Sequence, residues 1–190
     1  VLNRLGYNGW AFHNNTYTYY DRDITHENLG YNNGFMGYGN GMEQWVEWQW
    51  PESDLEMMQG TFDNLYGDAE PFNVYYMSVS GHGGYSWSSN MMSYKNYEVV
   101  EAAQLDYSET VQAYLAANVE LDRGLGYLVE QLEERGMADR TVIVISSDHF
   151  PYGLDSDGSL NYLSELYGFD VENNIQRDHN RLIIWAGSLE

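Results

Sequence analysis

The chain has 190 residues, within the usual range for one domain, and 43% of them are hydrophobic, which is enough for a real core. Its 29 acidic residues stand against 8 Lys and Arg, a formal net charge of −21, and this argues against a nucleic-acid partner and against docking on anionic lipid, since both need basic surfaces. There is no cysteine, so disulfides and thiolate chemistry are excluded, and no apolar run is long enough to cross a membrane.

The N-terminal part combines a short strand with a long loop. Residues 8–12 predict a strand, and His13 follows it directly. Residues 14–42 are rich in Asn, Tyr and Gly and show no clear period, so we expect an ordered loop with one helical turn near 25–29. Loops of this length in compact domains usually carry function.

The middle of the chain alternates helix and strand. A Ser-x-x-Glu capping box predicts a helix over 53–66, and a run of β-branched and aromatic residues predicts a strand over 72–79. A glycine-rich turn with His82 follows. The longest helix is expected over 106–135 from its apolar spacing of three, four and seven, with Gly136 as its stop.

The C-terminal part repeats the alternation. The apolar residues 141–147 predict a buried strand, which ends at Asp148 and His149. A short helix near 158–167 and a final strand over 181–186 complete the pattern. Strands that alternate with helices predict an α/β fold with a mainly parallel sheet flanked by helices, and residues 1–190 show no interior domain boundary, so we expect a single domain.

Three of the five histidines, His13, His82 and His149, come shortly after predicted strands. In open α/β sheets ligands bind at the carboxyl ends of strands, so parallel strands would bring these histidines to one edge. Asp148 and His149 supply the oxygen and nitrogen donors that a divalent cation takes. The alternative is a turn in which Asp148 bonds backbone amides and His149 is incidental.

Other polar and aromatic residues allow two interpretations. Arg22 could hold a phosphate or sulfate, or form an ordinary ion pair with a neighbouring Asp. His82 could bind an anion, or only a backbone carbonyl. His26 is expected to be solvated, and His179 precedes its strand and is not assigned to the site. The tryptophans at 45, 48 and 50 could stack on sugars, but packing of the loop is the favoured interpretation.

Several stretches together resemble a known family. The segments "FHNNTYTYYDRD", "YYMSVSGHGGY", "LDRGLGYLVEQLEERGMADRTVIVISSDH" and "RDHNRLIIWAG" are similar to the lipoteichoic acid synthase branch of the sulfatase and alkaline phosphatase superfamily. The combination of Phe-His, an Arg and Ser-x-His is specific to this branch. The resemblance spans most of the chain and implies an alkaline phosphatase/sulfatase-like fold.

The resemblance also implies roles for individual residues. Asp148 and His149 match two ligands of the catalytic metal, which is usually Mn²⁺ in this branch, with Mg²⁺, Ca²⁺ and Zn²⁺ as alternatives. His13, Arg22 and His82 match residues that contact the glycerol-phosphate group. Substrate contact is also expected at Tyr20, where the synthases commonly carry Trp.

The family's nucleophilic Thr and an acidic metal ligand lie upstream of every stretch that matches, so no catalytic nucleophile is assigned in this chain. The resemblance therefore implies the C-terminal portion of a sulfatase-like catalytic domain that lacks its N-terminal part, and we expect no turnover from the chain alone. The parent protein would sit at the extracytoplasmic face of a bacterial membrane, held there only by its missing N-terminal segments.

The expected activity of the parent is a metal-dependent transfer or hydrolysis of phosphoglycerol-type groups on a lipid or polymer substrate. A sulfatase or phosphodiester hydrolase on the same scaffold is one alternative. The other is a non-catalytic glycan-binding module, which the Tyr, Trp and Asn content favours.

Overall fold

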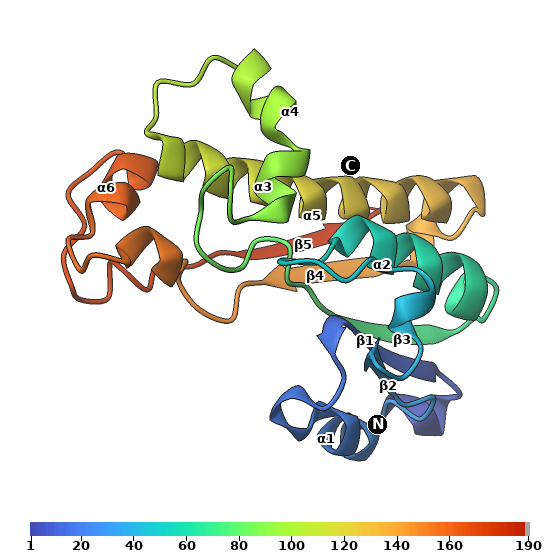
Figure 1. Cartoon of the computed structure of the whole chain (residues 1–190). Helices are drawn as coiled ribbons and strands as arrows, with labels where there is room; N and C mark the ends of the chain where they lie inside the picture. Colours follow the sequence, from blue (N-terminus) through green and yellow to red (C-terminus); the bar gives the residue numbers. More distant parts are fainter. Residues whose placement is uncertain (189–190) are drawn as a thin grey trace. The chain divides into compact units, whose positions relative to one another are not determined.

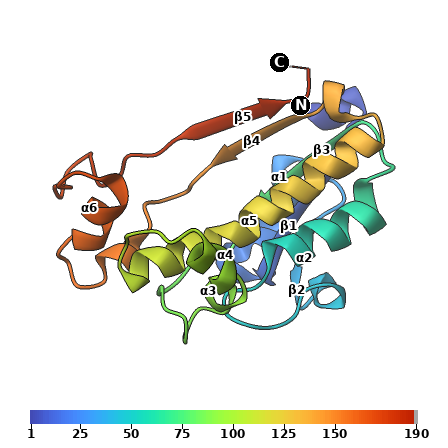
Figure 2. The ribbon, with the colours of Figure 1, turned by 90° about the horizontal axis from the view of Figure 1, so that it is seen from above.

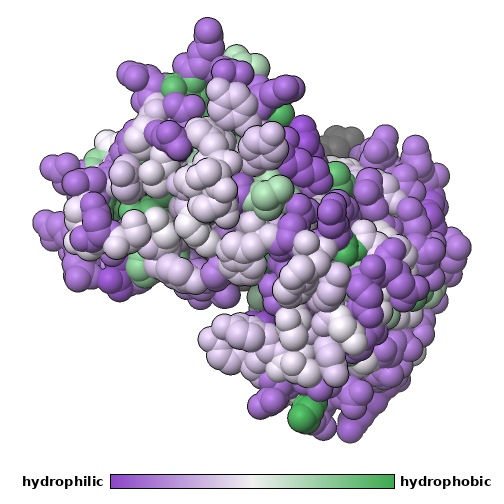
Figure 3. Space-filling model, in the orientation of Figure 1, coloured by the Kyte–Doolittle hydropathy of each residue, from purple (hydrophilic) through white to green (hydrophobic). Residues whose placement is uncertain are grey.

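The computed structural model describes residues 1–188. The chain folds into two compact units, which are treated separately below. The first unit joins Val1–Gly81 to Glu120–Tyr127, and the second joins His82–Val119 to the chain from Leu128 onward. Hydrophilic residues cover most of the face shown in Figure 3, as the large net charge leads one to expect. Among the described residues, none of the helices is both long and apolar enough to span a bilayer.

The first unit is built on a three-stranded parallel sheet. Its strands are β1 (Asn8–Thr16), β2 (Phe35–Tyr38) and β3 (Phe72–Met77), in the order β2-β1-β3. The predicted mainly parallel sheet flanked by helices is confirmed here. In Figure 1, α2 (Asp54–Thr61) lies above these strands and α1 (Arg22–Leu29) below them.

One face of the sheet packs on α1. Ala11 is in register with both Phe35 and Tyr75, so their side chains share a face. The His26 ring lies against this face, with its centroid 4.8 Å from the Phe35 ring and 5.2 Å from the Tyr75 ring. His26 is only 9% exposed, and burial lowers its pKa. The expectation that His26 is solvated was therefore wrong.

The opposite face packs on α2 and the π-helical turn η4 (Phe62–Tyr66) that continues it. Phe12 is fully buried between the rings of Tyr66 and Tyr76, at centroid distances of 6.1 and 5.4 Å. The hydroxyls of Thr61 and Tyr66 both bond the Tyr76 hydroxyl, at 2.6 and 2.9 Å. The predicted helix over 53–66 is confirmed, and Ser53 caps it by accepting the Glu56 N–H.

The long loop predicted over 14–42 is wrong in its interior. It contains the 3₁₀ turn η2 (Tyr19–Asp21), α1 and β2. These elements are only three to eight residues long, and the segments that join them are rich in Asn and Gly, so the local signal is weak. They form because His26 and Phe35 pack on the sheet, and tertiary contacts of this kind override propensity.

The second unit contains elements that the sequence predicted and two short helices that it did not. The structure confirms three predicted elements: β4 (Val142–Ser146), α6 (Asn161–Tyr167) and β5 (Leu182–Ala186). The unpredicted helices are α3 (Met91–Lys95) and α4 (Tyr97–Ala102). The remaining short turns are η1 (Leu2–Leu5) and η3 (Met42–Gln44) in the first unit, and η5 (Ala138–Arg140) and η6 (Tyr152–Asp155) in the second.

The strand after the long helix was predicted to be buried, but the structure shows it exposed. Within residues 1–188, β4 pairs only with β5, and the two run antiparallel, as Figure 2 shows. Val142 and Val144 are each 60% exposed, and Leu182 and Ile184 are similarly open. The Val and Ile content identified the strand correctly, but burial also needs a neighbouring layer, which sequence composition does not supply.

The longest helix is α5 (Glu109–Glu134), which passes through both units. It begins after Ser108, whose hydroxyl accepts the Val111 N–H, rather than at Asp106. Gly136 follows its end with φ of +64°, as the expected stop requires. The buried face of α5 contains small residues and one acid in addition to leucines. These residues are Ala113, Ala116, Ala117, Glu120 and Gly124.

The two glycines inside α5 differ in their surroundings, which gives a matched prediction. A Cβ on Gly124 would lie 2.7 Å from the Met58 sulfur of α2, whereas a Cβ on Gly126 would meet nothing within 4 Å. Close packing against α2 is therefore present at Gly124 and absent at Gly126.

We expect Gly126→Ala to raise the free energy of unfolding by about 1 kcal/mol through helix propensity. Gly124→Ala should lower it, because Met58 is buried and cannot move without loss of packing. Urea denaturation of both variants measures this. Equal effects of the two substitutions would contradict the packing described.

Candidate functional site

Asp148 and His149 follow β4 in the second unit, as predicted. His149 Nδ1 lies 2.7 Å from the Phe150 carbonyl oxygen, and since a carbonyl only accepts, Nδ1 carries the proton. His149 Nε2 then faces Asp148, 3.5 Å from Oδ1. Histidines that bind metals usually donate the other ring N–H to a carbonyl or carboxylate, as His149 does. The two donor atoms fit a shared divalent cation.

His82 lies beside this pair. Its ring centroid is 6.0 Å from that of His149, and the two rings meet edge to face. The Asn90 amide donates to the carbonyls of His82 and Gly84, at 3.2 and 3.3 Å, and so holds the glycine-rich turn. Burial and then the nearby His149 lower the pKa of His82, while Asp148 acts in the opposite direction. Burial and His149 thus favour the neutral form of the His82 ring.

His13 lies inside β1 rather than after it, because the strand is longer than predicted. It is in register with Met77 of β3, and its Nδ1 lies 2.9 Å from the Met77 carbonyl oxygen. This bond places the proton on Nδ1. Contact with a phosphoryl oxygen would therefore have to come from Nε2, and with only 5% exposure His13 has little freedom to reorient.

Tyr20 and Arg22 form a separate cluster in the first unit. The Arg22 guanidinium lies over the rings of Tyr19 and Tyr20, 5.6 and 5.3 Å from their centroids. In the described part of the chain it makes no ion pair with its neighbouring aspartates, which was the alternative interpretation. Tyr20 and Asp21 have φ of +58° and +51°, a left-handed conformation that costs about 1 kcal/mol or more per residue without glycine.

The predicted site residues thus fall in two groups. The first unit holds His13, Tyr20 and Arg22, and the second holds His82, Asp148 and His149. Within residues 1–188, no group of three or more His, Cys, Asp or Glu side chains is arranged to hold a metal ion. From their placement after strands and the family resemblance, five of these residues are predicted to surround one cleft: His13, Arg22, His82, Asp148 and His149.

Sequence reasoning missed a buried polar network beside His13. Asp54, fully buried at the start of α2, accepts hydrogen bonds from the Asn14 amide at 2.8 Å and the Val79 N–H at 2.9 Å. It also accepts the Ser80 N–H at 3.2 Å and the Ser80 hydroxyl. Asp54 therefore ties the chain just after His13 to the segment that leads from β3 toward His82.

Two further buried acids extend this network. The Ser53 hydroxyl, which caps α2, donates to fully buried Glu120 of α5. The Asn15 amide lies 3.2 Å from a carboxylate oxygen of Glu52, whose pKa is raised chiefly by burial. One sequence signal could have indicated this network. Glu120 is an acid spaced three or four residues from small residues on the buried face of α5.

Two of the three neighbouring tryptophans pack on elements of the first unit. A Cβ on Gly60 would lie 2.3 Å from the Trp45 ring, so Trp45 packs on α2. Trp48 packs on Tyr38 at a centroid distance of 4.6 Å. Both contacts agree with the packing interpretation. His179 is exposed in the turn before β5.

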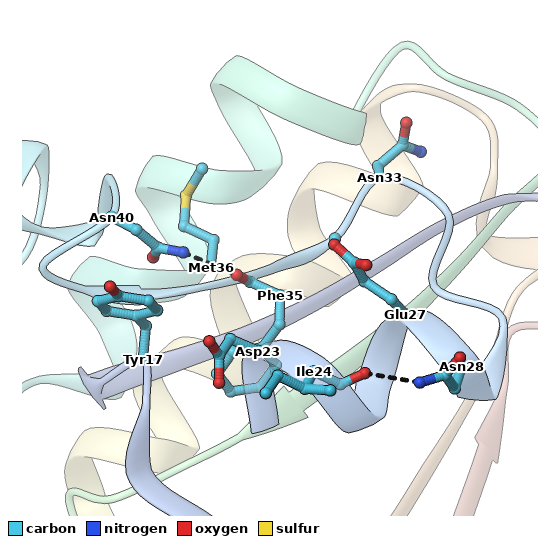
Figure 4. Close-up of a pocket in the computed structure, with 10 residues that line it drawn as sticks. Tyr17, Asp23, Ile24, Glu27, Asn28, Asn33, Phe35, Met36 and Asn40 are labelled. Carbon is cyan, nitrogen blue, oxygen red and sulfur yellow. Dashed lines mark hydrogen bonds between the residues drawn. The ribbon is translucent and has the colours of Figure 1, made fainter. Parts of the chain in front are cut away.

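A surface pocket of about 560 Å³ lies beside α1 and β2 (Figure 4). Carboxylates, carboxamides and one phenol dominate its lining, together with Ile24, Phe35 and Met36. Its polar members are Tyr17, Asp23, Glu27, Asn28, Asn33 and Asn40. Part of this polarity is structural, because the Asn28 amide donates to the Ile24 carbonyl and the Asn40 amide to the Phe35 carbonyl.

Comparison with known proteins places these features in a family. The sulfatase family profile matches residues 1–185. The lipoteichoic acid synthase of Staphylococcus saprophyticus is 24% identical over 181 residues, which are 95% of this chain and 26% of that protein. The crystal structure of the lipoteichoic acid synthase LtaP from Listeria monocytogenes superposes with a TM-score of 0.67 at 21% identity, over 97% of this chain and 44% of that one.

These matches confirm the resemblance drawn from the four sequence segments and the fold that it implied. The chain spans less than half the length of either relative. With a family profile that covers nearly all of its length, the chain belongs to the sulfatase family, within which it is similar to the lipoteichoic acid synthases.

Proposed function

We propose that the chain forms part of a metal-dependent enzyme that transfers or hydrolyses phosphoglycerol-type groups. The observation that carries this proposal is the pairing of Asp148 Oδ1 with His149 Nε2 at 3.5 Å, with the His149 Nδ1–H bonded to a carbonyl and His82 alongside. The similarity to lipoteichoic acid synthases supports a phosphoglycerol-bearing lipid or polymer as substrate. It also supports a site of action at the extracytoplasmic face of a bacterial membrane.

Asp148 and His149 are the residues that would hold the cation, with Mn²⁺ as the first choice and Mg²⁺, Ca²⁺ or Zn²⁺ as alternatives. Such a cation supplies a positive charge against the phosphoryl oxygens and activates a hydroxyl nucleophile. Arg22 would add a guanidinium, whose N–H groups bond phosphoryl oxygens in pairs. His13 and His82 would lie beside the same oxygens, and Tyr20 would contact the glycerol group.

We further propose that the nucleophile and the remaining cation ligands come from a segment upstream of this chain. The exposed apolar residues of β4 and β5 support this, because apolar strands of this kind are normally covered by another layer. Val142, Val144, Leu182 and Ile184 would lose their exposure to water against such a segment.

The test is an activity assay on a protein that contains this chain together with its upstream segment. With a fluorescent glycerophospholipid as donor, we expect Mn²⁺-dependent release of diacylglycerol that stops when EDTA removes the cation. The chain alone should give no turnover. Release that persists in EDTA, or sustained turnover by the chain alone, would contradict the proposal. Cleavage of an aryl sulfate in preference to the lipid would favour the sulfatase alternative.

A second candidate, a glycan-binding function, is favoured by the pocket in Figure 4. Carboxylates accept hydrogen bonds, and amides and phenols both accept and donate them. Such a lining suits the hydroxyl groups of a sugar, which also do both. Saturation-transfer NMR of the chain with neutral oligosaccharides tests it. Sugar binding that is lost in Glu27→Gln, without metal-dependent turnover in the longer protein, would favour this candidate over the enzyme.

A further inference from the structure

Tyr152 stands next to the candidate metal ligands, although no role has been assigned to it. It opens η6 in the second unit, three residues after His149. Its hydroxyl oxygen lies 2.6 Å from His82 Nε2, and its ring centroid lies 4.8 Å from that of His149. Tyr152 is 47% exposed. Its side chain is therefore open to solvent on one side while its hydroxyl contacts His82.

Two glycines allow this contact. A Cβ on Gly153 would lie 2.3 Å from the Gly83 carbonyl oxygen and 2.7 Å from the Tyr85 ring. No residue with a side chain fits there, so the turn after β4 and the glycine-rich turn that carries His82 approach each other backbone to backbone. This close approach brings Tyr152 to His82, and it gives a structural reason for the glycine in "PYG".

The tautomer of His82 decides the direction of this hydrogen bond. With the ring proton on Nε2, His82 donates to the Tyr152 hydroxyl oxygen, and the phenolic O–H is left to donate to another acceptor. With the proton on Nδ1, Nε2 only accepts and would repel a phosphoryl oxygen. The Nε2–H tautomer therefore suits an anionic ligand, and in it the phenolic O–H can donate to a phosphoryl oxygen beside His82.

We propose that Tyr152 is a phosphoryl-binding residue that also positions His82, holding the imidazole in one tautomer before the ligand arrives and donating to a phosphoryl oxygen afterwards. This inference rests on the proposed function, because it takes His82 as a phosphoryl contact. It adds a donor to the site through a hydroxyl group whose removal leaves the packing of the Tyr152 ring on His149 in place. Loss of the hydroxyl should therefore alter ligand binding without altering folding.

The experiment compares Tyr152→Phe with a matched control, Tyr94→Phe. Tyr94 is 65% exposed on α3 in the same unit. Calorimetric titration with glycerol 1-phosphate in Mg²⁺ gives the affinity, and ¹⁵N NMR of the imidazoles reports the His82 tautomer without ligand. We expect Tyr152→Phe to weaken binding roughly tenfold, the size of a hydrogen bond to a charged group. It should also shift the His82 Nε2 resonance and leave the melting temperature unchanged.

The control variant should match the wild-type chain in all three measurements. Wild-type affinity and an unshifted His82 resonance in Tyr152→Phe would overturn the inference while leaving the proposed function intact. A wild-type chain that binds no glycerol 1-phosphate would overturn the phosphoryl-binding role of Tyr152, whereas the proposed function is decided by lipid release in the longer protein.

Discussion

Replacing Asp148 by Ala should abolish metal-dependent phosphoglycerol release in the longer enzyme that we propose. The substitution removes the only carboxylate that faces His149 Nε2 among the described residues, so one charged ligand of the cation is lost. We expect a fall in turnover of roughly a hundredfold or more, the size seen when a group that stabilises transition-state charge is removed. Bound Mn²⁺ should fall with it, which metal analysis of the purified variant measures.

Asp148 lies on an exposed loop after β4, so the variant should fold normally. Asp170→Ala is the matched control, because Asp170 is an exposed acid of the same unit. It should retain wild-type turnover and metal content. Full metal content and normal release in Asp148→Ala would mean that Asp148 and His149 only form a turn.

Replacing Asp54 by Asn should cause the largest loss of stability. The carboxylate accepts four hydrogen bonds, three from amide N–H groups and one from the Ser80 hydroxyl. Asn places an NH₂ group among those donors, so at least one buried donor loses its acceptor. We expect the free energy of unfolding to fall by about 3 kcal/mol, measured by urea denaturation. Asp122→Asn, at an exposed position of α5 in the same unit, should change it little.

The effect of Asp54→Asn should also depend on pH. Burial raises the pKa of Asp54, and its hydrogen bonds offset part of that rise. An acid with a raised pKa in the folded state favours folding most below its unfolded pKa of about 3.9 and loses that contribution as pH rises through the folded pKa. The stability difference between the wild type and Asp54→Asn should therefore be largest near pH 4 and narrow toward pH 7. A difference that widens with pH would show that the hydrogen bonds outweigh burial.

Asp54 also illustrates what the sequence could not predict. Its position after a capping serine indicated a helix start, and that is correct. Its partners are Asn14 of β1 and Val79 and Ser80 in the segment after β3, all 25 or more residues away. A buried polar network depends on three-dimensional contacts that no local pattern records.

Periodic and strongly apolar segments were predicted well because their signals lie within a short stretch of sequence. The capping serine at 53, the spacing along α5 and the glycine at 136 act within a few residues of chain. The helical turn expected near 25–29 lies inside α1, but the first turn of α1 and the strand β2 were missed. Both elements are short, and contacts of His26 and Phe35 decide their structure. The Asp148–His149 pair was visible because both residues end one strand.

Tyr152 shows the same limit at the site itself. It lies 70 residues from His82 in the sequence, and the contact depends on the close approach of Gly153 and Gly83. The glycines were visible as turn residues, but their packing against each other was not.

The most direct measurement of the central claim is an anomalous diffraction map from crystals of the longer enzyme soaked in Mn²⁺ and glycerol 1-phosphate. The account predicts one manganese peak bound by Asp148 Oδ1 and His149 Nε2, with the phosphate within hydrogen-bond distance of His13, Arg22 and His82. A manganese peak bound by other residues, or phosphate density away from His82 and Arg22, would contradict it.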